Sequence, residues 1–394
     1  MSPSFESKIA GALYGGAIGD GIGAPVEGML RSEILQLVGP VNGLIPPTAW
    51  VDGAWAIAER ADGKGNGRIT DDTLMVEALI AAYEKQQDHM DATLYRDLFA
   101  PLVAGRRVWI PEYQREAPIL DRLASAEQYQ IKSLLKSHRD PRFFGAHLFQ
   151  ITCGGAMFAW PVGAANAGDP EAAYREAVAF FSAQTFSFGL EQSAVMAAAM
   201  AAALSPGATA TDVVEAAIPL AKDATREMIL RATGALTPNA DRDTDLPAIR
   251  AAVQPLHHKR THVTDTRELE LPARGVDHAG NTGLESRLHT SEELPVALAL
   301  LLRANGDVRE SICAGAEYGE DADSIAAMAG SLAGALAGAD NVPAEWREGA
   351  DRQNRRDYAH MAAAFAASLQ ILHQKDLKRQ QRRTKAMGVE TLDR

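Results

Sequence analysis

Runs of small apolar residues dominate the hydrophobic pattern of this chain. Residues 322–338 and 190–204 are almost entirely small or apolar, lack proline and hold one acidic residue each. A helix that is apolar on every side is buried, so we expect both runs to be helices in the centre of a bundle. Residues 8–23 add glycines at a spacing of four, which on a helix form a smooth groove for close packing; they are Gly11, Gly15, Gly19 and Gly23.

Helical patterns also cover 72–86, 91–104, 117–136 and several later segments, and no segment shows several alternating strands. Residues 30–68 are rich in proline and glycine, and they read as an ordered loop with at most one short helix. The pattern as a whole predicts an all-α fold.

We expect a single compact multi-helix domain over residues 1–373, with long loops. Two segments depart from the helical pattern. Residues 236–289 are charged and predict a loop-rich excursion. Residues 374–394 form a basic tail without apolar periodicity, which we expect to be disordered.

Two clusters of oxygen-bearing side chains lie where apolar helices should begin. Each combines a hydroxyl with two carboxylates: Thr70, Asp71 and Asp72 in one, and Asp321, Asp323 and Ser324 in the other. One explanation is helix capping, because these residue types are preferred N-caps and the helix dipole favours acids in the first turn. Capping uses only one or two of the oxygens, and adjacent carboxylates repel unless a cation lies between them. The repetition favours one shared binuclear metal site.

Glu27 is a further candidate, because Pro25 should end the helix over 8–23 and leave Glu27 on the loop that follows. With the four aspartates it would build a site of oxygen ligands alone, which selects hard cations such as Mg²⁺ or Mn²⁺ over zinc. Two such ions together can bind a substrate diol and activate a water.

Composition narrows the classes of function. The chain has 394 residues, 46% of them hydrophobic, and a formal net charge of −12, which argues against nucleic acid as a main partner. Its two cysteines exclude a disulfide framework and fit a reducing cytoplasm. We find no secretory signal and no run of about 18 strongly apolar residues, so we expect a cytoplasmic protein without a membrane span.

Other patterns leave alternatives open. The glycines of 8–23 do not match a dinucleotide-binding loop, and no strand pattern precedes them. Gly154 and Gly155 would let backbone amides approach an anion or a sugar, or would only permit a turn. His257 or His258 with His262 has the helical spacing of zinc ligands, but the surroundings are charged and no third ligand has a fixed spacing.

Four motifs together resemble those of the ADP-ribosylglycohydrolases, in the order of that family: GAIGDGIGAPVEG, ITDDT, CGGAMFAWPVG and GEDADSIAAMAGSLAGALAG. The resemblance covers Gly11 to Gly338. It implies an all-α fold, two metal ions and hydrolysis of the bond between ribose C1 and an attached group. The positions that match the metal ligands of the family are Thr70, Asp71, Asp72, Asp321, Asp323 and Ser324.

The resemblance also implies roles for other residues. Glu27 matches a carboxylate beside the metals and the scissile ribose, while Gly154, Gly155 and Met157 match a loop that cradles the phosphates of ADP-ribose. Two departures concern the substrate: Phe158 stands where many members have arginine, and Phe186 replaces a usual histidine. An aromatic ring cannot pair with a phosphate but can stack on a flat group, so a smaller ribosyl substrate is an alternative.

We therefore expect a metal-dependent hydrolase of a ribosyl bond, with ADP-ribose on a protein or a small acceptor as the first substrate to consider. The alternatives are an N-ribosyl hydrolase of small nucleosides or nucleotides and a non-catalytic ADP-ribose-binding protein. Departure from C1 leaves oxocarbenium character, which an anionic site stabilises. The residues expected to position or deprotonate the attacking water are Glu27, Asp72 and Asp321.

Overall fold

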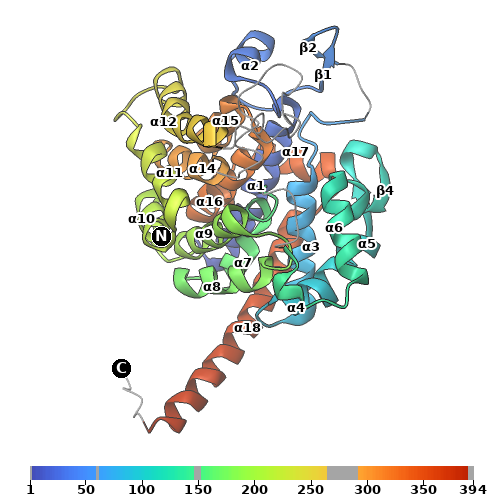
Figure 1. Cartoon of the computed structure of the whole chain (residues 1–394), viewed down its shortest axis with the longest axis vertical. Coiled ribbons are helices and arrows are strands. Elements are labelled where there is room, and N and C mark those ends of the chain that lie inside the picture. Colours follow the sequence, from blue (N-terminus) through green and yellow to red (C-terminus); the bar gives the residue numbers. More distant parts are fainter. Residues whose placement is uncertain (1, 59–61, 146–151, 264–291, 389–394) are drawn as a thin grey trace.

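Two apolar helices, α1 (Phe5–Gly23) and α16 (Ala322–Ala337), run through the middle of the molecule (Figure 1). The computed structural model of the chain describes residues 2–58, 62–145, 152–263 and 292–388, the side chains of 223 and 254–263 excepted. Nearly every residue of both helices is buried, as their apolar patterns predict. They form the centre of an all-α fold.

Glycines bring the backbones of α1 and α16 into direct contact. A Cβ atom on Gly334 would lie 1.9 Å from the carbonyl oxygen of Gly11, and one on Gly15 would lie 2.0 Å from that of Gly330. Real Cβ atoms do not approach an oxygen so closely, so no larger residue fits there without a shift of the helices. The predicted glycine groove is thus confirmed, and its partner is a second row of glycines on α16.

Other helices surround this pair. α16 packs against α15 (Val308–Tyr318), α14 (Glu293–Arg303), α9 (Ser187–Ala203) and α3 (Asp71–Gln86), and α1 packs against α15, α17, α18 and α3. The other α-helices of the described residues are α2 (Arg31–Val38), α4 (Ala92–Leu94), α5 (Ala100–Gly105), α6 (Ser125–Lys136), α7 (Trp160–Ala165), α8 (Pro170–Phe181), α10 (Ala210–Leu220), α11 (Asp223–Gly234), α12 (Arg242–Val263), α17 (Ala344–Asn354) and α18 (Tyr358–Ala386).

Two short antiparallel hairpins depart from the predicted elements. In the loop over 30–68, β1 (Thr48–Val51) pairs with β2 (Ala54–Ile57), and Trp50 packs edge to face on Trp55 across the pair. The second hairpin joins β3 (Arg107–Ile110) to β4 (Arg115–Pro118). The helix expected over 117–136 is therefore wrong at its start, because 115–118 pair with β3 and α6 begins only at Ser125.

Helices also extend into the two segments expected to be irregular. α12 occupies 242–263 of the predicted loop-rich excursion. Its histidines fall where side chains are not described, so the alternative zinc site lies outside the described residues.

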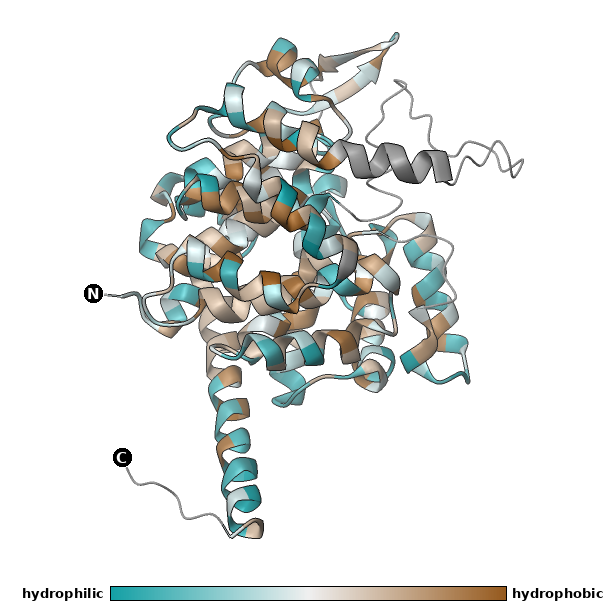
Figure 2. Ribbon diagram, turned by 60° about the vertical axis from the view of Figure 1, so that its left-hand side comes forward, coloured by the Kyte–Doolittle hydropathy of each residue, from teal (hydrophilic) through white to brown (hydrophobic). Residues whose placement is uncertain are grey.

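The basic tail is helical rather than disordered as far as 386, because α18 continues through it and projects from the body (Figures 1 and 2). Two contacts hold this part of α18 against the body: Lys375 Nζ donates to Gln87 O at 2.7 Å, and Arg379 pairs with Asp88. Over the part of the chain that the structure describes, no helix is long and apolar enough to cross a membrane.

Candidate active site

The two oxygen clusters meet at the N-termini of α3 and α16, which pack against each other. Thr70 is the N-cap of α3 and Asp321 is the N-cap of α16. Burial raises the pKa of Asp72 well above its usual value, and the next largest cause is the negative charge of Asp323. Carboxylates 251 positions apart along the chain, those of Asp72 and Asp323, thus act on one another directly.

Glu27 joins this group from the end of α1. It follows the short 3-10 helix η1 (Ala24–Val26), and one oxygen each of Glu27, Asp321 and Asp323 lie within 4.8 Å of one another. Burial and the charge of Glu27 raise the pKa of Asp323 well above its usual value. The structure therefore brings together the carboxylates that the sequence predicted, on three separate elements.

Helix capping accounts for only part of these oxygens. The Thr70 hydroxyl accepts a hydrogen bond from the Asp72 amide at 3.4 Å, whereas the Asp321 side chain caps nothing. Asp72 accepts a 3.2 Å hydrogen bond from the Thr70 hydroxyl at one oxygen, and its other oxygen is buried without a hydrogen-bond partner among the described residues. A buried carboxylate oxygen without a donor suits a ligand that is a cation.

Asp20, which the sequence reading missed, fixes the start of α3. It is fully buried on α1 and accepts hydrogen bonds from the amides of Thr70 and Thr73, at 2.9 and 3.1 Å, and from the Thr73 hydroxyl at 2.6 Å. Burial raises the pKa of Asp20 to about 6, against the effect of these donors. The sequence signal that could have pointed to Asp20 is that it is the one acidic residue in the glycine-rich run over 8–23.

Two basic residues reach into the acidic cluster. Lys64 contacts Glu27, and its Nζ lies 3.4 Å from Asp323 Oδ2. Arg122 pairs with Asp71 at 3.0 Å and with Glu112. Burial lowers the pKa of Lys64, but the charges of Glu27 and then Asp323 raise it by more, so the ammonium stays charged beside the carboxylates. Neither residue was predicted: Lys64 lies in a glycine-rich loop just before the ITDDT motif, and Arg122 lies in a turn outside the four motifs.

The acid-rich cluster fits divalent cations. Asp72 and Asp323 are both buried, and the charge of each neighbouring carboxylate disfavours ionisation of the next. A dication between them would offset this repulsion and supply the missing partner of Asp72. Its oxygen donors are those that hard cations prefer. The described residues that could provide them are Glu27, Thr70, Asp71, Asp72, Asp321, Asp323 and Ser324.

The glycine turn over 153–157 closes one side of the cluster. Met157 is buried and lines a small cavity together with Asp72 and Thr73. A Cβ on Gly154 would lie 2.7 Å from Glu127 Oε1, and one on Gly155 would lie 2.4 Å from Ser193 Oγ, so a larger residue at either position requires these side chains to move. Their contact with a phosphate stays a prediction.

Phe158 does not face the site, which corrects the role expected for it. Its side chain is fully buried, stacks on Phe99 with ring centroids 5.6 Å apart, and meets Phe181 edge to face at 5.1 Å. The ring of Phe158 is therefore part of the hydrophobic core, and a ligand has no access to it. Phe186 is half-buried at the N-cap of α9, and its role in substrate binding stays a prediction.

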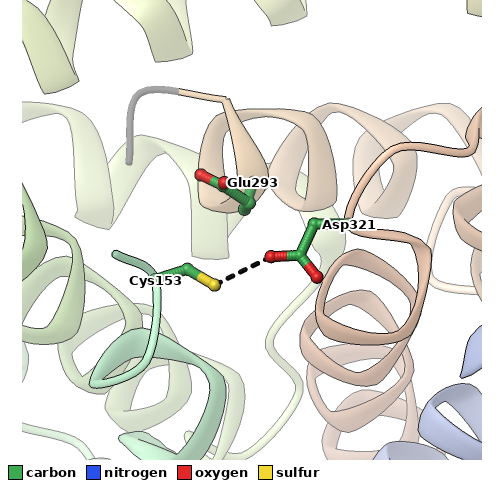
Figure 3. Close-up of side chains that lie close together, drawn as sticks. All are labelled: Cys153, Glu293 and Asp321. Carbon is green, nitrogen blue, oxygen red and sulfur yellow. Dashed lines mark hydrogen bonds between the residues drawn. The ribbon is translucent and has the colours of Figure 1, made fainter. Parts of the chain in front are cut away.

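Three further groups near the cluster were missed. Cys153 donates from Sγ to Asp321 Oδ2 at 2.9 Å, and Glu293, the first residue of α14, lies beside them (Figure 3). Glu127 on α6 has one buried oxygen without a partner among the described residues. Burial and the charge of Asp71 raise the pKa of Glu127 to about 8. Cys153 opens the CGGAMFAWPVG motif and was passed over there, whereas Glu127 and Glu293 lie outside the four motifs.

Comparison with known proteins decides the family. A family model described as ADP-ribosylglycohydrolase matches residues 1–378. The chain belongs to the ADP-ribosylglycohydrolase family. It is also 25% identical over 362 residues to the uncharacterized protein YegU of Escherichia coli (strain K12), an alignment that covers 91% of this chain and 96% of that protein.

A solved chain described as an ADP-ribosylglycohydrolase-related protein complex is 18% identical, with a TM-score of 0.48 over 93% of this chain and 99% of the other. Membership of the ADP-ribosylglycohydrolase family confirms the resemblance in the motifs, and it supports a glycohydrolase-type function on an all-α fold.

Proposed function

We propose that this protein hydrolyses the bond between ribose C1 and an attached group, as an ADP-ribosylglycohydrolase that depends on two divalent cations. One observation supports this most: the carboxylates of both clusters converge around Asp72 and Asp323, and the buried Asp72 Oδ1 lacks a partner among the described residues. Capping or packing gives no reason to gather buried acids in this way.

Mg²⁺ or Mn²⁺ ions would be held by the six predicted ligands at the starts of α3 and α16. Bound there, the ions supply Lewis acidity and a template for the ribose hydroxyls. Asp20 keeps the start of α3 in place through its hydrogen bonds to Thr70 and Thr73. Arg122 holds Asp71 at 3.0 Å and thereby restricts the orientation of its carboxylate.

Glu27 is the candidate for positioning the attacking water or taking its proton. Its side chain is 27% exposed, whereas that of Asp323 is 4% exposed, so among these two it is the one that solvent can reach. Lys64 contacts Glu27 and keeps it next to Asp323. The remaining negative charge of the site favours an oxocarbenium-like transition state at C1.

The substrate class has two candidates, ADP-ribose attached to a protein or small acceptor, and a smaller nucleoside or nucleotide. The ion pairs of Lys64 and Arg122 with acids of the cluster favour the smaller substrate, because these cations are already engaged. The buried position of Phe158 removes its ring as a stacking surface for a smaller substrate, and Phe186 remains as a candidate for that role.

The test is an activity panel at saturating Mn²⁺ with ADP-ribosyl-arginine, ADP-ribosyl-serine, nucleosides and nucleoside monophosphates. We expect release of the ribosyl group from at least one class. A kcat/KM that favours the ADP-ribosyl substrates by more than about a thousandfold, roughly 4 kcal/mol, would exclude the smaller-substrate candidate. Tight binding of ADP-ribose with no turnover of any member would identify a non-catalytic binder instead.

A further inference from the structure

A thiol and two carboxylates form a second group of side chains around Asp321. One ligand atom each of Cys153, Glu293 and Asp321 lie within 4.8 Å of one another; Cys153 and Asp321 point toward each other, and Glu293 lies beside them (Figure 3). They come from the glycine turn, the start of α14 and the N-cap of α16. Asp321 also belongs to the oxygen group with Glu27 and Asp323, so it is shared between two neighbouring groups.

Glu293 is the unusual member. Its residue is 1% exposed, and neither of its carboxylate oxygens has a hydrogen-bond partner among the described residues. Its position in the first turn of α14 gives it the favourable end of a helix dipole, but that interaction is worth only about 0.3–2 kcal/mol. Burial of an ionised carboxylate without hydrogen-bond donors costs more free energy than this. A cation bound beside Glu293 would offset that cost.

The donor set around Glu293 suits a metal ion that accepts sulfur. Cys153 Sγ lies 2.9 Å from Asp321 Oδ2 and 3.6 Å from Ser324 Oγ. Sulfur and oxygen ligands on one tetrahedral zinc ion lie about 3.5 Å apart, so these atoms are near the spacing that an ion requires. A small opening of the Cys153–Asp321 contact would complete it. Mg²⁺ binds oxygen ligands and has little affinity for thiolates.

We infer that Cys153, Glu293 and Asp321 form a cation position that takes a thiophilic divalent ion, such as Zn²⁺, Fe²⁺ or Co²⁺, in preference to Mg²⁺. Ser324 Oγ is the fourth donor. On binding, the Cys153 S–H bond breaks, its proton passes to solvent, and a sulfur–metal bond forms without change of oxidation state. This inference rests on the proposed function to the extent that Asp321 and Ser324 also serve the predicted binuclear site.

The test uses Co²⁺ as an optical probe of sulfur ligation. Wild-type protein freed of metal with a chelator is titrated with Co²⁺ while its near-ultraviolet spectrum is recorded. We expect a thiolate-to-cobalt charge-transfer band that saturates at one thiolate-bound ion per chain. The band should be absent from Cys153→Ser, and the affinity for Zn²⁺ should fall at least about tenfold in both Cys153→Ser and Glu293→Gln.

Cys313→Ser is the matched control. Cys313 is also fully buried, on α15, and it is not part of either ligand group, so this variant should keep the band and the Zn²⁺ affinity. A band that survives Cys153→Ser, a band lost with Cys313→Ser, or no band in the wild type would overturn the inference. Zinc-edge X-ray absorption on the wild-type protein needs no variant, and it should show one sulfur at about 2.3 Å.

Failure of this inference can be told apart from failure of the proposed function. If sulfur does not bind the ion but the oxygen site is real, Mg²⁺ or Mn²⁺ will still bind Cys153→Ser with wild-type affinity and no band will appear in any variant. If the proposed hydrolase activity is wrong, no ribosyl substrate will be cleaved with any metal, while the cobalt band and its loss in Cys153→Ser will persist.

Discussion

Asp72 is the residue at which the metal hypothesis can be tested most directly. Burial, and then the charges of neighbouring carboxylates, raise its pKa, and one of its oxygens lacks a partner among the described residues. Asp72→Asn removes a negative charge from this group while keeping its shape, so we expect loss of Mn²⁺ binding and of turnover. The metal-free variant should be as stable as the wild type or more stable, because like-charge repulsion falls.

Calorimetric titration with Mn²⁺ and thermal unfolding in chelator measure the two effects. Asp340→Asn is the control, since Asp340 is exposed in a short 3-10 helix and should change neither quantity. If Asp72→Asn keeps its Mn²⁺ affinity and turnover, the cluster at the start of α3 serves only as a helix cap.

Replacing Lys64 should change the metal affinity in the opposite direction from Asp72→Asn. Its ammonium contacts Glu27 and lies 3.4 Å from Asp323 Oδ2, where it competes with a dication for the same oxygens. Lys64→Met should therefore bind Mn²⁺ several times more tightly, and its metal-free form should unfold at a lower temperature. Lys132→Met, at an exposed position on α6, should leave both values unchanged. Weaker Mn²⁺ binding in Lys64→Met would show that the lysine supports the site instead.

At the scale of the helices, glycine-to-alanine changes inside and outside the interface of α1 and α16 should differ most in their effect on stability. Gly334→Ala places a Cβ 1.9 Å from the Gly11 carbonyl oxygen, so the helices must separate. We expect a loss of at least about 2 kcal/mol in the free energy of unfolding. Gly349→Ala, in α17, meets nothing within 4 Å and should be neutral or gain up to about 1 kcal/mol from helix propensity. Urea unfolding of both variants measures this difference, and equal effects would contradict the tight interface.

The sequence predicts an element when the residues that determine it are neighbours along the chain, and misses it when contacts with distant segments determine it. Glycine spacing and apolar runs are local, so α1, α3, α9 and α16 were predicted, as was the grouping of their acids. The four-residue strands were missed because such short pairs depend on their partner strand. Lys64 and Glu293 reach the site only through the tertiary fold, and no motif marks them; Cys153 opens the CGGAMFAWPVG motif, but its contact with Asp321 also depends on the fold.

The tail shows a different kind of miss. Its Lys, Arg and Gln residues favour a helix although they carry no apolar stripe, and the absence of that stripe suggested disorder. The contacts of Lys375 and Arg379 with residues 87 and 88 supply tertiary anchors that the pattern could not reveal.

At the scale of the whole molecule, His89 links the body to α18. It pairs with Glu176 of α8 and, at 2.9 Å, with Asp376 of α18. Burial lowers the pKa of His89, but the hydrogen bond and charge of Glu176, followed by those of Asp376, raise it from 6.5 to about 9. A raised pKa in the folded state means that the stabilising contribution is complete below about pH 6.5 and is lost as the pH rises through about 9.

We therefore expect the melting temperature of the wild type to exceed that of His89→Gln near neutral pH, with a difference that shrinks as the pH rises through about 9. Thermal unfolding across this range measures the effect. His138→Gln, at an exposed position, should follow the wild type throughout. A difference that is constant with pH would mean that the charge of His89 does not hold α18.

The backbone contact between α1 and α16 also bears on how this protein can change over generations of mutation. Asp20 lies within α1, Glu27 directly follows η1, and Asp321 is the N-cap of α16, so main-chain atoms fix the spacing of all three. Exchanges of side chains elsewhere in the core hardly alter that spacing. Libraries that vary the loop over 30–68 can therefore search for new specificities, while the spacing of these three acids is carried unchanged from variant to variant.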